Sequence, residues 1–475
     1  MKKSSIPFLL LIIPLTLSAE QLSKKEILQY AFSHSEELSM IKKELASAQS
    51  VEKEYRGKGF PTIEASVNYQ LAPRQFIPYS FDIGGGSGGG ISGLLDQSVD
   101  GFINDATIAG AFDQIISSLS DFDFTPGKNT VALGLTLTQP IFAQGKISKG
   151  LKIAQVYYGL LDLKYKNAKI TLAKEITNAY NSALLADQNR EVRLQAVSLA
   201  EETHRLTRAR LESGKGNVLD TLNSRFSLQQ AKLALRDAEK NRHLAVKNLL
   251  TIASMDADPD EIVLTDSLYV IDFDMTEEEA FKRLSEENIS IQQIDKGIEM
   301  QKWQTKIVKA DFLPTVYAGA SISKISMFDN RDEFSWGDDQ KIFVGASIPI
   351  YSGGQKLQKV KQSGYEEQKL EETRKKTLNQ LHLALASCFE ELAVAKEECS
   401  EALHLIALTT QGAQIASLSY EIGQITQVDL TNSRQQLSMS KLAYHNAVHK
   451  LNAAITGIKM LIGDNSLLLA EQEDK

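Results

Sequence analysis

Strict alternation of hydrophobic and polar residues marks four short stretches of the chain. In the first, Ile63 and Val67 alternate with polar residues such as Glu64 and Asn68. A period of two predicts a strand with one apolar face and one polar face. We therefore expect four strands, at about residues 62–71, 130–139, 315–325 and 341–350. Each is close to the ~9–11 residues of a strand that crosses a membrane.

Two long tracts without proline follow the strand pairs. Residues 141–258 and 350–475 contain no proline and are rich in residues that favour helices. In the first tract, hydrophobic residues recur every seven positions, at Leu185, Val192, Leu199 and Leu206. Such spacing favours helices that pack on one another as a coiled coil. Each tract is long enough for two antiparallel helices, so we expect two long helical hairpins.

Glycines interrupt both tracts and predict where each hairpin turns. Gly214 and Gly216 lie in one interruption, and Gly423 lies in the other. Glycine readily takes the left-handed conformation that often ends a helix. We expect the two tips at residues 213–217 and 421–426, with Thr426 in the second turn.

The two halves of the chain match each other at a fixed offset of 209 residues. Pro140-Ile141-Phe142 corresponds to Pro349-Ile350-Tyr351, and Asn223-Ser224-Arg225 corresponds to Asn432-Ser433-Arg434. An offset that stays constant over such a distance indicates an internal duplication. The halves differ in the segment that joins their two strands. In the first half this segment is a long Gly-rich loop at 72–128, which we interpret as a flexible insertion.

The domain organisation follows from this repeat. Residues 1–19 have the charged start, apolar stretch and small-residue end of a secretory signal peptide. We expect a first repeat at 20–258, a second repeat at 259–465 and a C-terminal tail at 466–475. Each repeat contributes two strands followed by one helical hairpin.

Charge, cysteine content and hydropathy narrow the function. The net charge of −8 gives no support for a nucleic-acid partner. Cys388 and Cys399 are too far apart along one helix for a disulfide. After the signal, no apolar run approaches the ~18 residues of a membrane helix, so only strands are candidates for entering a membrane. Four strands cannot close a barrel, which needs at least about eight, so several chains would have to share one.

The duplicated order of strands and hairpins resembles the TolC family of outer-membrane efflux proteins. The matching local patterns are Gly59-Phe60-Pro61-Thr62, Phe312-Leu313-Pro314-Thr315, Pro349-Ile350-Tyr351-Ser352-Gly353-Gly354, and Tyr420 with Gly423. The resemblance covers roughly residues 20–465. No single motif is very specific, and the duplicated arrangement carries most of the weight.

This resemblance implies a mixed, mainly α fold in a homotrimer. Four transmembrane β-strands per chain would contribute to a shared twelve-stranded β-barrel in the cell outer membrane, in contact with its lipid. The coiled-coil hairpins of three chains would form an α-barrel that makes up a large periplasmic portion. The trimer would be a passive export duct for small molecules or secreted proteins. Its partners would be a periplasmic adaptor protein and an inner-membrane pump.

The resemblance also suggests residues for a gate at the hairpin tips. Asp429 corresponds to an aspartate that narrows the channel in the family, and Asp220 is its counterpart in the first repeat. Tyr420 corresponds to a tyrosine of the closing network, to which we add Arg225 and Arg434. The turns at Gly214, Gly216, Gly423 and Thr426 would dock the adaptor. Two positions depart from the family: Asn432 replaces an aspartate, and Ile425 replaces an arginine.

Simpler interpretations of these residues remain open. An aspartate near a helix N-terminus is favoured by the helix dipole alone. Arg225 and Arg434 could form ordinary ion pairs. His445 and His449 are one helical turn apart but lack a third ligand nearby, so no metal site is expected.

The chain shows no catalytic or cofactor-binding motif, so we expect neither an enzyme nor a cofactor. One alternative is a periplasmic coiled-coil structural or adaptor protein without a pore. Another is a trimeric adhesin stalk, which the antiparallel hairpin pattern disfavours.

Overall fold

The computed structural model describes residues 20–71, 129–328 and 334–464. The expected signal peptide at 1–19, the Gly-rich loop at 72–128 and the tail at 466–475 lie outside these residues. The chain divides into two compact units, of which one contains residues 45–160 and 295–372 and the other the remaining segments. Each unit therefore takes segments from both sequence repeats, because the two copies pack against each other.

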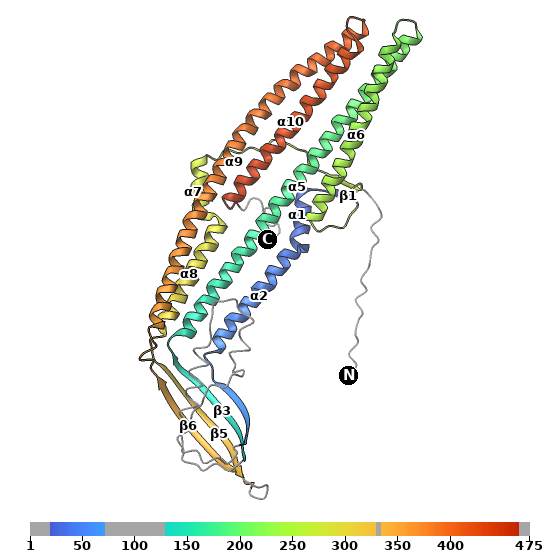
Figure 1. The fold of residues 1–475 in the computed structure, drawn as a ribbon. Helices are drawn as coiled ribbons and strands as arrows, with labels where there is room; N and C mark the ends of the chain where they lie inside the picture. The colour runs from blue at the N-terminus through green and yellow to red at the C-terminus, as the bar shows by residue number, and fades with distance from the viewer. Residues whose placement is uncertain (1–19, 72–128, 329–333, 465–475) are drawn as a thin grey trace, which may run out of the picture. The chain divides into compact units, whose positions relative to one another are not determined.

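Four antiparallel strands form one sheet in the order β2-β3-β5-β6 (Figure 1). Strand β2 spans Thr62–Leu71, β3 Asn129–Ala143, β5 Thr315–Phe328 and β6 Gly337–Ser347. Strand β3 pairs with β2 inside its own repeat and with β5 of the other repeat. The duplicated strand pairs thus join edge to edge.

The boundaries of three strands differ from the expected ones, and one of these is β5, which extends to Phe328 instead of ending at 325. Strand β6 begins at Gly337 and ends at Ser347, whereas the sequence predicted 341–350. Pro349 follows closely and has no N–H to donate to a ladder, which explains the early end. Strand β3 continues past Gln139 to Ala143, and a register shift between Pro140 and Phe142 accommodates the proline.

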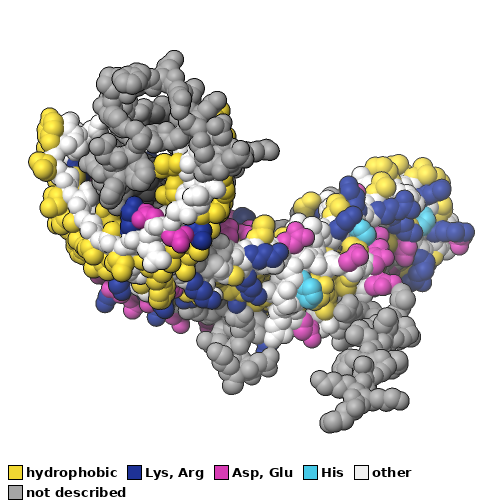
Figure 2. Space-filling model, turned by 90° about the horizontal axis from the view of Figure 1, so that it is seen from below, with side chains coloured by type: hydrophobic (Ala, Val, Ile, Leu, Met, Phe, Trp, Pro, Cys, Tyr) yellow, Lys and Arg dark blue, Asp and Glu magenta, His cyan; other side chains and the backbone are white. Residues whose placement is uncertain are grey.

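One face of the sheet is covered by exposed hydrophobic side chains. Ile342 and Val344 of β6 are 90% and 75% exposed, and Ile63 and Val67 of β2 are 70% and 74% exposed. Figure 2 shows hydrophobic side chains along the convex side of the curved sheet, while other residues line its concave side. The alternation in the sequence therefore separates two chemically different faces, and the apolar one carries strongly exposed side chains.

Two helical hairpins of equal dimensions follow the strand pairs (Figure 1). Helix α5 (Lys146–Glu212) and helix α9 (Gln355–Glu421) each have 67 residues. The returning helices α6 (Val218–Ile252) and α10 (Gln427–Leu461) each have 35 residues. The two sequence repeats therefore also match in the lengths of their helices. Among the described residues, no helix is long and apolar enough to cross a membrane.

Shorter elements begin each repeat. Helices α1 (Lys24–His34) and α2 (Glu36–Gly57) precede β2, and α7 (Glu277–Glu287) and α8 (Ile289–Ala310) precede β5. Strands β1 (Glu20–Leu22) and β4 (Ile262–Leu264) form a parallel pair that the sequence did not predict. They are only three residues long, which is too short for a visible alternation.

Each hairpin base packs on its own hydrophobic core. In the first, Ile176, Tyr180 and Leu249 are almost fully buried between α1, α5 and α6. In the second, Leu385, Leu451 and Ile455 are almost fully buried between α7, α9 and α10. These two cores hold the bases of the hairpins.

Candidate functional site

Both hairpin tips are closed by a glycine in the left-handed conformation. Gly214 has a φ of 71° and Gly423 has a φ of 81°. The amide of Lys215 donates to the carbonyl of Arg210 at 2.9 Å, and that of Gln424 donates to the carbonyl of Ser419 at 2.8 Å. These bonds satisfy carbonyls left open at the ends of α5 and α9. The turns lie where the sequence placed them.

Gly216 is required for a different reason. A Cβ at this position would lie 2.6 Å from the backbone nitrogen of Leu211 and 2.8 Å from the carbonyl carbon of Arg210. The first tip turn thus folds back onto the last turn of α5, and only glycine allows this approach.

Asp429 forms part of the N-terminal cap of α10. Its carboxylate accepts from the Thr426 hydroxyl at 2.7 Å and from the Thr426 amide at 3.0 Å, and its own amide donates to the Thr426 hydroxyl. These hydrogen bonds lower the pKa of Asp429, which keeps the exposed carboxylate charged.

Asp220 lies at the corresponding place in α6 without such a cap. Asn217 takes the capping role there, and its side chain accepts from the amide of Leu219 at 3.0 Å. Asp220 remains half-buried in the first turn. The two aspartates are therefore equivalent by sequence but not in their surroundings.

Arg210 connects the two tips. It donates from Nη2 to the carbonyl oxygen of Tyr420 at 2.8 Å and to that of Glu421 at 2.9 Å. Its guanidinium also lies 4.6 Å from the centre of the Tyr420 ring, which is 96% buried. Tyr420 thus belongs to a contact between the hairpins. The sequence did not single out Arg210, since its repeat counterpart is Ser419.

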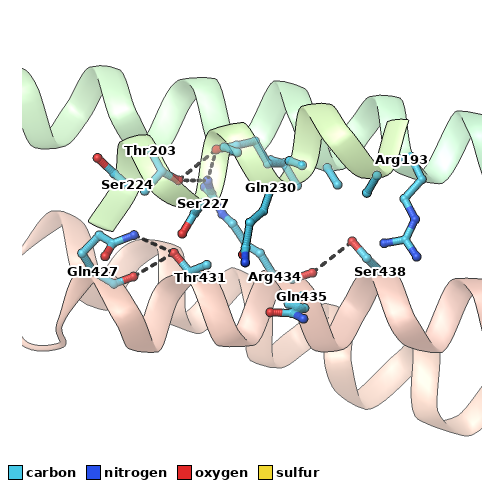
Figure 3. Close-up of a pocket in the computed structure, with 15 residues that line it drawn as sticks. Arg193, Thr203, Ser224, Ser227, Gln230, Gln427, Thr431, Arg434, Gln435 and Ser438 are labelled. Carbon is cyan, nitrogen blue, oxygen red and sulfur yellow. Dashed lines mark hydrogen bonds between the residues drawn. The ribbon is translucent and has the colours of Figure 1, made fainter. Parts of the chain in front are cut away.

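Arg434 makes a second connection between the hairpins. From α10 it donates Nη1 to the carbonyl of Leu199 at 2.8 Å and to the hydroxyl of Thr203 at 2.7 Å (Figure 3). Its Nη2 lies 3.5 Å from a carboxylate oxygen of Glu202. Arg225, its repeat counterpart, is exposed on α6. The structure brings Tyr420 and Arg434 into inter-hairpin contacts but leaves Arg225 at the surface.

A polar cluster lies on the inner side of the first hairpin. The Ser224 hydroxyl lies 2.8 Å from that of Thr207 and 3.0 Å from Nδ1 of His204. Ser224 and Thr207 are almost fully buried although both are polar. Their mutual hydrogen bonds offset the cost of that burial. No periodic signal in the sequence distinguishes such residues from ordinary surface serines and threonines.

Between the hairpins lies a cavity of about 200 Å³, lined by side chains of α5, α6 and α10 (Figure 3). Arg193 and Arg434 contribute the two charges of its lining. Gln427 is 99% buried at one end, where its Nε2 donates to the Thr431 hydroxyl at 2.8 Å. Its Oε1 has no hydrogen-bond partner within the part of the chain that the structure describes. The interface between the hairpins therefore holds a cavity with both polar and apolar lining, and one buried amide oxygen at its end lacks a partner among the described residues.

His445 and His449 lie one helical turn apart on α10. No group of three potential ligands occurs among the described residues. Burial lowers the pKa of both His445 and His449, so these side chains are neutral at pH 7. Cys388 and Cys399 are both free, and burial raises the pKa of each thiol.

Comparison with known proteins identifies relatives of this chain. The chain is 26% identical over 257 residues to the alkaline protease secretion protein AprF of Pseudomonas aeruginosa, a match that covers 52% of each protein. The chain therefore spans about half the length of AprF. It is 22% identical over 340 residues to the outer membrane efflux protein BepC of Brucella suis, covering 70% of this chain and 71% of BepC.

The solved structure of the outer membrane protein VceC from Vibrio cholerae matches with a TM-score of 0.69 at 15% identity, covering 93% of this chain and 96% of that chain. This likeness confirms the expected fold of long hairpins and a small antiparallel sheet. The sequence pattern of the outer membrane efflux proteins matches residues 109–254 and 281–464. The chain belongs to the outer membrane efflux protein family, as its resemblance to TolC-like channels predicted.

Proposed function

We propose that the chain is one subunit of a passive, homotrimeric export duct. It would carry small molecules or secreted proteins across the outer membrane from a periplasmic adaptor and an inner-membrane pump. One observation carries this proposal: within the part of the chain that the structure describes, the four-stranded sheet has two unpaired edges and an exposed apolar face. The chain contributes a conduit and a gate, and its partners supply the energy.

The edges of the sheet require further copies of the chain. Among the described residues, β2 and β6 each pair with a single neighbour, so one side of each strand is open. Open strand edges are not viable in the hydrocarbon of a membrane, because their N–H and C=O groups would be unsatisfied. Pairing of β6 with β2 of the next copy removes both edges. Three copies would close a twelve-stranded barrel.

The faces of the sheet fit the same arrangement. A barrel in lipid needs an apolar outer face and tolerates a polar interior. The convex face of this sheet carries the exposed hydrophobic side chains, including Ile342 and Val344. Lipid would cover these residues, whose exposure to water is unfavourable.

The contacts at the hairpin tips supply the elements of a gate. Arg210 and Arg434 each join the two hairpins through hydrogen bonds to backbone carbonyls, and Tyr420 packs beneath one of them. Separating the hairpins at the tips would break these bonds. An adaptor that docks on the turns at Gly214, Gly216, Gly423 and Thr426 is well placed to compensate for that loss. Asp220 and Asp429 would line the aperture and favour cations.

Two measurements test the proposal. Cell fractionation should place the chain in the outer membrane as an oligomer that dissociates on heating in detergent. The purified oligomer should form conducting channels in planar lipid bilayers. A soluble periplasmic monomer that forms no channels would overturn the proposal. That outcome would favour the alternative of a periplasmic structural or adaptor protein without a pore.

The cargo is a separate question, since AprF is named for protease secretion and BepC for efflux. Comparison of a deletion strain with its parent would separate the two classes. Loss of one protein from the culture medium would indicate secretion, whereas increased sensitivity to small toxic compounds would indicate efflux.

A further inference from the structure

The segments that join the strands to the long helices are strongly basic. Four windows of ten residues on the helix side of the sheet, 52–61, 143–152, 302–311 and 352–361, each contain three basic residues. These are Lys53, Arg56, Lys58, Lys146, Lys149, Lys152, Lys302, Lys306, Lys309, Lys356, Lys359 and Lys361, which we call the basic collar. The same windows contain only three acidic residues, in a chain with a net charge of −8.

Among the described residues, three ion pairs neutralise part of the collar. Glu52 pairs with Arg56 at 2.8 Å, and Glu54 pairs with Lys58 at 3.3 Å. Asp311 pairs with Lys146, at 2.5 Å, and this pair is largely buried. Each acidic residue of the windows is thus matched by one base of the collar. Lys149 and Lys356 also make internal contacts, since their ammonium groups donate to the backbone carbonyls of Gln144 and Asp311. Exposed lysines elsewhere in the collar are accessible to an external partner.

Several collar lysines are exposed and extend from helix surfaces. Lys152, Lys309 and Lys359 are exposed on α5, α8 and α9. They come from three different chain segments, and all belong to the unit that contains the sheet. The collar is therefore a feature of the junction as a whole and not of one helix.

Exposed apolar and aromatic residues border the collar at the ends of the strands. Phe60 is 68% exposed before β2, Phe312 is 50% exposed before β5, and Tyr351 is 88% exposed after β6. The ammonium group of Lys356 lies 5.9 Å from the centre of the Phe312 ring, which places the two kinds of side chain at one level. Aromatic residues of membrane proteins gather at the headgroup level.

The chemistry of the surface changes in a fixed order from the sheet to the helices, and a lipid leaflet changes in the same order. An apolar sheet face is followed by aromatic residues and then by lysines on long flexible stems. A lipid leaflet presents hydrocarbon, then the glycerol region, then phosphate groups. Lysine stems can cover apolar surface while the ammonium group reaches the phosphates. Basic residues next to a membrane are attracted to anionic lipids, by about fivefold in affinity per residue.

We propose that the basic collar binds the phosphate headgroups of anionic phospholipids in the inner leaflet of the outer membrane. It thereby fixes how deeply the strands sit in the membrane. The inference rests on the proposed function, because it requires the sheet to span that membrane. It adds a lipid class and a set of binding residues that the export function does not itself require.

The two tryptophans of the chain offer a direct test. Trp303 lies within the collar, where the ammonium group of Lys306 is 3.7 Å from the centre of its ring. Trp336 lies just before β6, at the opposite end of the strands. In the Trp336→Phe variant, fluorescence of the full-length oligomer reports only on the collar. Lipids with brominated acyl chains quench tryptophans that they contact.

The experiment reconstitutes this variant in vesicles with increasing fractions of brominated phosphatidylglycerol or brominated phosphatidylcholine. We expect the anionic lipid to reach half-maximal quenching at a several-fold lower mole fraction, and the difference to shrink at high salt. Adding Lys152→Gln, Lys309→Gln and Lys359→Gln should largely remove the preference. The matched control replaces three exposed lysines of the other unit, Lys240, Lys247 and Lys282, by glutamine and should retain it.

The same vesicles are assayed for channel conductance, which separates the two proposals. Normal channels with equal quenching by both lipids would overturn the lipid-binding inference alone. An equal loss of the preference for anionic lipid in the collar variant and in the control would also overturn it. Removal of any three positive charges would then be enough to lower that preference. Protein that forms no channels would overturn the export function and this inference together.

Discussion

Arg210 near the end of α5 and Tyr420 near the end of α9 form a contact that joins the two hairpin tips. The Arg210 guanidinium donates to the Tyr420 carbonyl at 2.8 Å while lying 4.6 Å from the centre of the same residue's ring. A cation thus satisfies carbonyls at the negative end of a helix dipole. Because Tyr420 is buried, the contact anchors the second tip from both its backbone and its side chain.

Replacing Arg210 by Gln should loosen the second tip. The loss of two hydrogen bonds and of the ring contact should cost about 1–2 kcal/mol locally. Amide hydrogen exchange in the last turn of α9 should then accelerate by about five- to thirtyfold, and single channels should spend more time open. Arg208→Gln is the matched control, since Arg208 pairs only with Glu212 on its own helix surface. Equal effects of the two variants would remove Arg210 from the gate.

Arg434→Met should separate the hairpins farther from the tip. The variant keeps much of the apolar stem but removes the bonds to Leu199 and Thr203 that tie α10 to α5. We expect faster hydrogen exchange around Thr203 and earlier protease cleavage near the tips. Arg225→Met, at the exposed repeat counterpart, should change neither. Unchanged exchange in both variants would show that Arg434 does not hold the hairpins together.

The sequence predicted the large elements well because they depend on periodicity and on residues with strong backbone preferences. Proline-free tracts with a seven-residue repeat indicated α5 and α9, and the glycines at 214 and 423 indicated their ends. The alternating stretches indicated all four long strands. The boundaries of β3, β5 and β6 differed, and in β3 and β6 a proline, which has no N–H to donate to a strand ladder, lies near the C-terminal end of the strand.

The contacts of the tips could not be predicted in the same way. Arg210 binds the backbone carbonyls of two residues more than two hundred positions away, and no local sequence pattern encodes such a contact. The duplication even misled, because it made Arg225 and Arg434 look equivalent while only Arg434 faces the other hairpin. Equal positions in two repeats have different neighbours once the repeats pack against each other.

Asp220 and Asp429 should together influence ion selectivity. Because hydrogen bonds from Thr426 lower the pKa of Asp429, its charge should persist to lower pH than that of an ordinary aspartate. Asp220→Asn combined with Asp429→Asn should reduce the preference for cations, measured as a smaller reversal potential in a salt gradient. Asp237→Asn, on the exposed surface of α6 away from the tip, is the control. Unchanged reversal potentials would exclude both aspartates from the aperture.

Gly216→Ala should distort the first tip, whereas Gly364→Ala should be tolerated. At Gly216 the added methyl group would meet the backbone of Arg210 and Leu211, so the turn must move and the Arg210 contact with it. We expect a loss of about 1–3 kcal/mol. At Gly364, inside α9, nothing lies within 4 Å of the added Cβ, so alanine should stabilise the helix by about 0.5–1 kcal/mol. Melting temperatures of the two variants should therefore shift in opposite directions, and equal shifts would contradict this account.

Acidification should weaken the packing of α10 through His445 and His449. Burial lowers the pKa of both side chains below the usual value near 6.5, so the unfolded chain binds their protons more readily than the folded chain. Stability from this source is complete above about pH 7 and falls as the pH drops from 6.5 through the lowered pKa values. Protonation would also place a donor on Nδ1 of His449, which has no partner among the described residues.

The test compares melting temperatures of the solubilised oligomer at about pH 7.5 and pH 5.5, a window in which ordinary carboxylates remain charged. The lowered pKa of Asp429 keeps that group out of this window as well. His445→Gln combined with His449→Gln should reduce the decrease in melting temperature that wild-type protein shows. His34→Gln should leave it unchanged, since His34 is exposed on α1. An equal decrease in all three proteins would assign the acid sensitivity to groups outside α10.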